Sequence, residues 1–135
     1  MFLFIAAGGS LGAILRYAAS KYVHANMGAM FPWGTVFVNL AGSFFIGFFY
    51  EIFEKQVISP EIRNFIAIGF LGAFTTFSTY SLETVNLLKN KEIKWALFNV
   101  LLQNITGIIL VIFGFYFARV LLKLVKNVIL ESTLL

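Results

Sequence analysis

Residues 69–83 read GFLGAFTTFSTYSLE, in the middle of the third long apolar segment of the chain. Within residues 75–81, six of the seven side chains carry a hydroxyl group, and the seventh is Phe77. Two glycines, Gly69 and Gly72, precede this cluster. A backbone group without a partner in hydrocarbon costs several kcal/mol, so a helix that loosens here must face protein or water. The stretch therefore predicts a broken membrane helix that lines an ion path.

Composition places the rest of the chain in the same membrane. The 135 residues are 60% hydrophobic, 18% aromatic and only 12% charged. Four apolar stretches each have the length needed to cross about 30 Å of hydrocarbon. These features predict an all-α membrane protein with one transmembrane domain, residues 1–135, and a break in the third helix. The predicted helices cover about residues 2–19, 33–53, 64–88 and 95–118.

Several other classes of protein are excluded by the same inventory. The chain has no cysteine, so disulfides, thiolate metal sites and thiol nucleophiles are absent. Its single histidine, His24, falls in a predicted loop and is expected to be a solvated surface group. The net charge of +4 comes from dispersed residues that flank the spans, which indicates membrane topology and no nucleic-acid partner. The serines and threonines have no base to activate them, so we expect no enzyme activity.

Polar side chains inside the predicted spans indicate contacts within the bundle. Thr35 and Asn39 share one helix face, and an intramembrane amide needs hydrogen-bond partners. Phe77 and Tyr80 also share a face, and Glu83 follows one turn later. An interhelical hydrogen bond without a transport role is the alternative for Asn39, and ordinary packing is the alternative for the two aromatic residues.

The first and fourth predicted helices carry further signals. Gly8 and Gly12 form a G-xxx-G pair, which favours the close approach of another helix. Arg16 is within reach of the interface, where it either snorkels to the head groups or gathers anions at a pore mouth. In the fourth helix, Asn99, Gln103 and Thr106 form a polar stripe.

Charge leaves the orientation of the chain open. The side that holds both termini and the second loop carries five Lys and Arg residues, and the opposite side carries the other five of the ten. The positive-inside rule needs an imbalance to choose an orientation, so the chain should insert both ways. Four short helices enclose too little volume to form a pore within a single chain. An antiparallel, dual-topology homodimer is the expected assembly.

Taken together, these segments resemble the Fluc (CrcB) family of fluoride channels over nearly the whole chain. The resemblance is carried by GGSLGAILRY in the first helix, GTVFVNLAGSFFIG in the second and GFLGAFTTFSTYSLE in the third. It implies a multi-pass protein of the cell inner (plasma) membrane, a dual-topology homodimer with two pores. Such a dimer conducts fluoride passively out of the cytoplasm and gives fluoride resistance.

The resemblance also implies roles for particular residues. Phe77 and Tyr80 match the pore aromatics, whose ring edges face the anion. The family usually has phenylalanine at the second of these positions. Further matches along the fluoride path are Asn39, Ser78, Thr79 and Thr35.

Other positions match the family's structural features. Gly72 and Thr75 match the helix break whose backbone carbonyls, from both subunits, hold a structural sodium ion. Arg16 and Glu83 match positions near the pore entrance and the interface.

The fourth helix departs from this pattern. Gly107 and Val111 occupy the positions where the family has small hydroxyl residues on a polar track, with Gln103 just before them. A second interpretation is therefore one subunit of a heterodimeric fluoride channel in which a single pore is competent. A small multidrug-resistance-type exporter would need a carboxylate deep in the first helix, which has none. A membrane subunit without transport activity, whose polar residues only join helices, is the third alternative.

Overall fold

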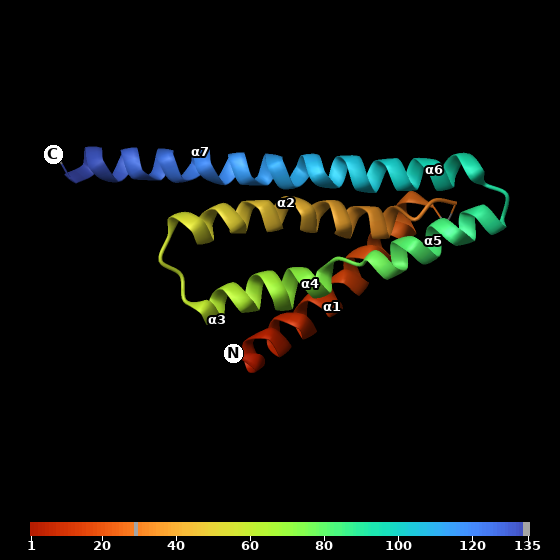
Figure 1. Ribbon diagram of the computed structural model, residues 1–135, viewed down its shortest axis with the longest axis horizontal. Helices are drawn as coiled ribbons and strands as arrows, with labels where there is room; N and C mark the ends of the chain where they lie inside the picture. The colour runs from red at the N-terminus through yellow and green to blue at the C-terminus, as the bar shows by residue number, and fades with distance from the viewer. Residues whose placement is uncertain (29, 134–135) are drawn as a thin grey trace.

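The computed structural model of this protein describes residues 1–28 and 30–133, nearly all of them helical (Figure 1). Among these residues, four helices are long and apolar enough to cross a membrane: Phe2–Met27, Trp33–Lys55, Pro60–Lys89 and Ile93–Ile129. The start of α1 and the last turns of α7 lie toward the same end of the bundle (Figure 1). The prediction of an all-α membrane protein with four spanning helices is confirmed.

The first two spans are continuous helices, α1 (Phe2–Met27) and α2 (Trp33–Lys55). α1 continues well beyond residue 19, where the sequence predicted its end. Residues 20–27 contain no glycine or proline, so nothing in the chain stops the helix before Gly28. Gly28 has φ 88°, a backbone conformation that glycine adopts without steric cost. His24 consequently lies on α1 and not in a loop, although its side chain is exposed as expected.

The third span is broken, as predicted. It contains α3 (Pro60–Arg63), the π-helical segment η1 (Asn64–Leu71), α4 (Gly72–Phe74) and α5 (Phe77–Lys89). Between α4 and α5, the two threonines at 75 and 76 have extended backbones, with ψ angles of 159° and 114°. The helix therefore stops and restarts in the middle of the hydroxyl run.

The fourth span combines α6 (Ile93–Leu101), a second π-helical segment η2 (Leu102–Thr106) and α7 (Gly107–Thr133). α7 continues past residue 118, the end predicted from the sequence. No glycine or proline follows Gly114, so the chain offers no helix-terminating residue in that region. The C-terminal part of α7 projects beyond the end of α2 (Figure 1).

Glycines allow the spans to approach closely. A Cβ atom on Gly8 would collide with the carbonyl of Phe65, and one on Gly12 with the carbonyl of Phe70. The predicted packing seam on α1 is thus confirmed, and it receives the first half of the broken span. On the other side of α2, Gly47 faces the carbonyl of Val111 on α7. One seam therefore packs α1 against the first half of the broken span, and the other packs α2 against α7.

Candidate functional site: the cavity at the helix break

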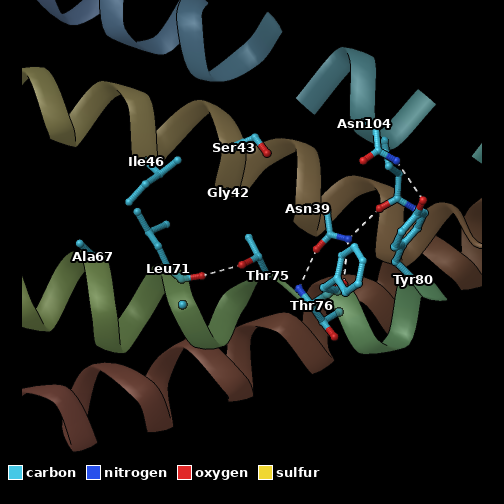
Figure 2. Close-up of a pocket in the computed structure, with 13 residues that line it drawn as sticks. Asn39, Gly42, Ser43, Ile46, Ala67, Leu71, Thr75, Thr76, Tyr80 and Asn104 are labelled. Carbon is cyan, nitrogen blue, oxygen red and sulfur yellow. Dashed lines mark hydrogen bonds between the residues drawn. The ribbon is translucent and has the colours of Figure 1, made fainter. Parts of the chain in front are cut away.

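The break in the third span opens onto a cavity of about 380 Å³ (Figure 2). Its walls come from α2, from the two halves of the third span and from the π-helical segment η2. The lining residues are Asn39, Gly42, Ser43, Ile46, Ala67, Leu71, Gly72, Thr75, Thr76, Phe77, Tyr80, Gln103 and Asn104. Amide and hydroxyl groups gather at the α5 end of this cavity, and aliphatic side chains line the opposite end (Figure 2).

Asn39 of α2 holds the break open. Its Oδ1 accepts the backbone N–H of Thr76 at 2.7 Å, and its Nδ2 donates to the carbonyl of Thr76 at 3.0 Å. In a continuous helix, the N–H of Thr76 would donate to the carbonyl of Gly72, four residues earlier. The side chain of Asn39 therefore replaces the missing helical hydrogen bond and satisfies both backbone groups of one broken residue.

A buried chain of side-chain hydrogen bonds continues from Asn39 into the fourth span. Nδ2 of Asn39 donates to Oε1 of Gln103 at 2.7 Å, and Nε2 of Gln103 donates to Oδ1 of Asn99 at 2.8 Å. Asn99 is fully buried, and its Nδ2 donates to the hydroxyl of Thr84 at 2.8 Å. Thr84 in turn donates to the carbonyl of Tyr80. The polar stripe predicted for the fourth helix thus joins the break to the middle of α5 through Asn99 and Gln103.

The two aromatic residues lie side by side at the cavity. The ring centroids of Phe77 and Tyr80 are 5.4 Å apart, and both rings line the cavity. Phe77 is 77% exposed in the isolated chain, whereas Tyr80 is only 8% exposed. The hydroxyl of Tyr80 accepts a hydrogen bond from Nδ2 of Asn104 at 2.9 Å. No described residue accepts the hydroxyl hydrogen of Tyr80, so this O–H remains available as a donor.

The hydroxyls after the break cap the second half of the helix. Thr76 is the N-cap of α5, and its Oγ1 accepts the N–H of Thr79 at 3.2 Å. The same Oγ1 lies 3.0 Å from the hydroxyl of Thr79 and 3.3 Å from that of Ser78. Ser78 and Thr79 are exposed in the isolated chain. Thr76 and Phe77, at the start of α5 where a helix carries partial positive charge, line the cavity, whereas Ser78 and Thr79 do not.

Thr35 and Glu83 meet at a second, smaller cavity. The hydroxyl of Thr35 donates to Oε1 of Glu83 at 2.8 Å, and both residues line a cavity of about 240 Å³. Tyr17, Ser20, Lys21 and His24 of α1 line it as well. Oε2 of Glu83 is buried and has no hydrogen-bond partner among the described residues. Arg16 does not line this cavity, so the structure does not bring it together with Glu83 in one chain.

The two positions matched to a sodium site flank the break. Gly72 lies in α4 and lines the main cavity, and its carbonyl has lost the N–H of Thr76 to Asn39. Thr75 lies in the break itself, and its hydroxyl donates to the carbonyl of Leu71 at 3.0 Å. Among the described residues, no group of three or more His, Cys, Asp or Glu side chains could hold a metal ion, so any cation here would rely on backbone carbonyls.

Gly107 and Val111 lie on the seam between α2 and α7. A Cβ atom on Gly107 would stand 3.5 Å from Oγ of Ser43, and the backbone of Val111 packs against Gly47. Ser43 lines the main cavity from α2. A hydroxyl is therefore present beside Gly107, but it comes from the second span and not from the fourth.

Sequence reasoning missed several of these residues. The cap at Thr76 could have been found, because a hydroxyl residue commonly opens a helix. The contact of Asn104 with Tyr80 could not, because it depends on the local widening of the helix in η2. The ion pair between Glu51 and Arg119, at 2.9 Å, was missed as well. Glu51 is only 1% exposed, and Arg119 lies over the rings of Phe115 and Tyr116.

Comparison with known proteins gives one consistent answer. A family model described as CrcB-like protein, Camphor Resistance (CrcB), matches residues 3–115. A fluoride-specific ion channel FluC of Magnetococcus marinus is 41% identical over 122 residues, which cover 90% of this chain and 96% of that protein. Proteins of the same name from Shewanella frigidimarina and Thermus thermophilus are 50% and 42% identical over 77% and 84% of this chain. These matches cover 83% and 90% of the two relatives.

The matched region contains every residue of the cavity at the helix break. A family model that covers most of the chain agrees with relatives at 41–50% identity over most of their own length. The chain therefore belongs to the CrcB-like family of membrane proteins.

Proposed function

We propose that this protein is a fluoride-selective ion channel that passively exports cytoplasmic fluoride across the plasma membrane and so gives fluoride resistance. The relatives that share 41–50% of its residues are named fluoride-specific ion channels. The observation that carries the proposal is the helix break at residues 75–76, which places the start of α5 at one cavity together with the hydroxyl groups of Ser43 and Tyr80. Helix N-termini with free donors favour anions.

The chemistry of the cavity suits a small, strongly hydrated anion. Fluoride gives up its water only where a row of donors replaces it, and the cavity offers the hydroxyls of Tyr80 and Ser43. The ring edges of Phe77 and Tyr80 add positive electrostatic potential, because an aromatic quadrupole is positive at its edge. Chloride is larger and forms weaker hydrogen bonds, so it should be excluded. The proposed path consists of Asn39, Phe77, Ser78, Thr79, Tyr80 and Thr35.

We place the entrance near Glu83 and Arg16. The smaller cavity beside Glu83 is lined by Lys21, which supplies positive charge next to the carboxylate. Arg16, on the same helix, would add to the attraction of anions. Thr35 bonds to Glu83 and stands one turn from Asn39 on α2, so it links the entrance to the break.

The assembly we propose is an antiparallel, dual-topology homodimer with two pores. The equal division of the ten Lys and Arg residues supports insertion in both orientations. Phe77, Ser78 and Thr79 are exposed in the isolated chain although they surround the break, which supports a second subunit over this face. Membrane lipid would cover the remaining apolar surface.

A structural sodium ion at the centre of this dimer is the accompanying proposal. We assign two backbone carbonyl oxygens to it as ligands, those of Gly72 and Thr75. The carbonyl of Gly72 has lost its helical hydrogen-bond partner, and Thr75 lies in the break. Unwound carbonyls of this kind coordinate sodium in other membrane proteins. When bound, the ion would neutralise carbonyl dipoles that face one another across the two subunits.

Passive efflux from liposomes that contain the purified chain alone tests the proposal. Fluoride efflux without chloride efflux is the expected result, and it would also establish that the homodimer is competent. Efflux of both anions at similar rates would contradict selectivity. Silence for both anions would leave two options, a heterodimer or a membrane subunit without transport activity. Co-expression with a related chain would separate them, because only the heterodimer would then regain fluoride efflux.

A further inference from the structure

A second polar groove lies far from the helix break, between the C-terminal end of α2 and the C-terminal part of α7. It encloses about 870 Å³, and Lys55 of α2 lines it together with Arg119, Lys123 and Lys126 of α7. Residues 119, 123 and 126 recur at intervals of four and three, so they share one helix face. That face looks onto the end of α2.

The groove carries an excess of positive charge. Glu51 also lines it, but this carboxylate is 1% exposed and is paired with Arg119 at 2.9 Å. No carboxylate among the described side chains lies within ion-pair distance of Lys55, Lys123 or Lys126. Three lysines therefore converge on one groove without a charge partner from this part of the chain.

The position of the groove relative to the membrane indicates what could supply that partner. The fourth helical span, Ile93–Ile129, has 37 residues, including the basic residues near its C-terminal end. At about 1.5 Å per residue it is roughly 55 Å long, whereas the hydrocarbon core is about 30 Å thick. The span is therefore longer than the hydrocarbon is thick, and its excess length is the part of α7 that projects beyond the end of α2 (Figure 1). The three lysines consequently lie at the level of the lipid head groups.

Apolar side chains accompany the lysines along α7. Leu122, Val125 and Ile129 line the same groove. A free inorganic anion would use only the lysines, whereas a phospholipid would place its phosphate among them and its acyl chains along the apolar wall. Basic pockets of this kind between membrane helices bind anionic head groups.

We propose that this groove binds the head group of an anionic membrane phospholipid, with Lys55, Lys123 and Lys126 as the phosphate-binding residues. The inference goes beyond the fluoride path and does not depend on it. Lys123 and Lys126 lie outside the part of the chain that matches the family model, residues 3–115, whereas Lys55 lies inside it.

Native mass spectrometry of the purified chain in detergent provides the test. Dioleoylphosphatidylglycerol is titrated against dioleoylphosphatidylcholine, which has the same acyl chains and no net charge, and against inorganic phosphate. Each lysine near an anionic lipid contributes enough binding energy for roughly fivefold in affinity, so K123Q/K126Q should weaken phosphatidylglycerol binding roughly 30-fold. K89Q/K91Q is the matched control, because it removes the same charge from the opposite end of the bundle.

A charge-conserving variant, K123R/K126R, should bind phosphatidylglycerol as the unmodified chain does, and it separates loss of charge from loss of folding. Equal weakening in K123Q/K126Q and K89Q/K91Q would overturn the proposal. So would equal affinity for the two phospholipids. Inorganic phosphate that displaces phosphatidylglycerol at comparable concentration would also overturn it, since the groove would then bind a free anion.

Discussion

Asn39 and Thr76 form a two-point clamp between the second span and the break in the third. One amide side chain accepts the N–H of Thr76 at 2.7 Å and donates to its carbonyl at 3.0 Å. A backbone residue without helical partners is thereby satisfied inside the membrane, where each unpaired group is costly. The break is held from outside the helix that contains it.

Replacing Asn39 with aspartate tests this clamp and the proposed path together. Asn39→Asp keeps an acceptor for the N–H of Thr76 but loses both donated hydrogen bonds and adds a negative charge. Two like charges about 4 Å apart repel by about 4 kcal/mol at an effective dielectric constant of about 20, so fluoride efflux should fall by roughly a hundredfold or more. Liposome efflux measures the change. The control is Asn86→Asp on the exposed side of α5, and wild-type flux in Asn39→Asp would contradict the assignment of the path.

Phe77 supplies positive electrostatic potential at the edge of its ring in the proposed path. Isoleucine has a similar volume but no aromatic ring, so Phe77→Ile removes this potential. Aromatic edge contacts contribute about 0.5–1.5 kcal/mol, so Phe77→Ile should reduce fluoride efflux by up to roughly tenfold. Phe37→Ile, an exposed aromatic residue of α2 outside the cavity, serves as the control. Equal flux in Phe77→Ile and the unmodified chain would show that the ring lies off the path.

Tyr80 separates the contribution of a ring from that of a hydroxyl. Tyr80→Phe keeps the ring edge, removes the hydrogen bond that Nδ2 of Asn104 donates to the Tyr80 hydroxyl at 2.9 Å, and removes one free donor from the cavity; Nδ2 of Asn104 keeps the carbonyl of Val100 as acceptor. A hydrogen bond of this kind contributes about 1 kcal/mol, so we expect a modest, roughly fivefold decrease in fluoride efflux with selectivity over chloride retained. Tyr80→Ala should abolish efflux. Loss of selectivity in Tyr80→Phe would mean that the hydroxyl, and not the ring, discriminates between the anions.

Gln103 is the link between the clamp and the fourth span. Gln103→Leu removes one partner each from the half-buried amide of Asn39 and the buried amide of Asn99, and an unsatisfied buried group costs about 1–3 kcal/mol. The melting temperature of the purified protein, measured as the loss of its monodisperse peak in size-exclusion chromatography, should fall by several degrees. Fluoride efflux should decrease as well. Gln56→Leu, at an exposed position, should change neither. An unaltered melting temperature in Gln103→Leu would show that the hydrogen bonds of Gln103 with Asn39 and Asn99 do not stabilise the bundle.

The ion pair of Glu51 and Arg119 is expected to stabilise the packing of α2 on α7. Arg119→Met leaves the buried carboxylate of Glu51 without a partner, so the variant should unfold at a lower temperature than the unmodified chain. The double variant Glu51→Leu/Arg119→Met should recover most of that loss, because it removes the buried charge as well. Thermal denaturation of the two variants in detergent measures the difference. If both variants lose the same thermal stability, the stabilisation by Arg119 comes from its contacts with the rings of Phe115 and Tyr116.

The helix content, the four spans and the break were all predictable from the sequence. Apolar segments longer than about 18 residues specify membrane helices locally. A run of hydroxyl residues after Gly72 predicts a break in the helix, because such side chains compete for the hydrogen bonds of the helix backbone. Thr76 caps the restarted helix by this local mechanism. The G-xxx-G seam at Gly8 and Gly12 was predictable for the same reason, since its spacing is visible in one helix.

The partners of those residues were decided by the tertiary structure. Asn39 needed a partner, but nothing in its own helix specified that Thr76 and Gln103 would be the ones, 37 and 64 residues away. The local widening in η2 turns Gln103 and Asn104 together toward the site, and single-helix spacing does not predict it. Glu51 was overlooked because its arginine lies 68 residues further on. Segment type follows from local composition, whereas satisfaction of a buried polar group depends on which distant helix packs beside it.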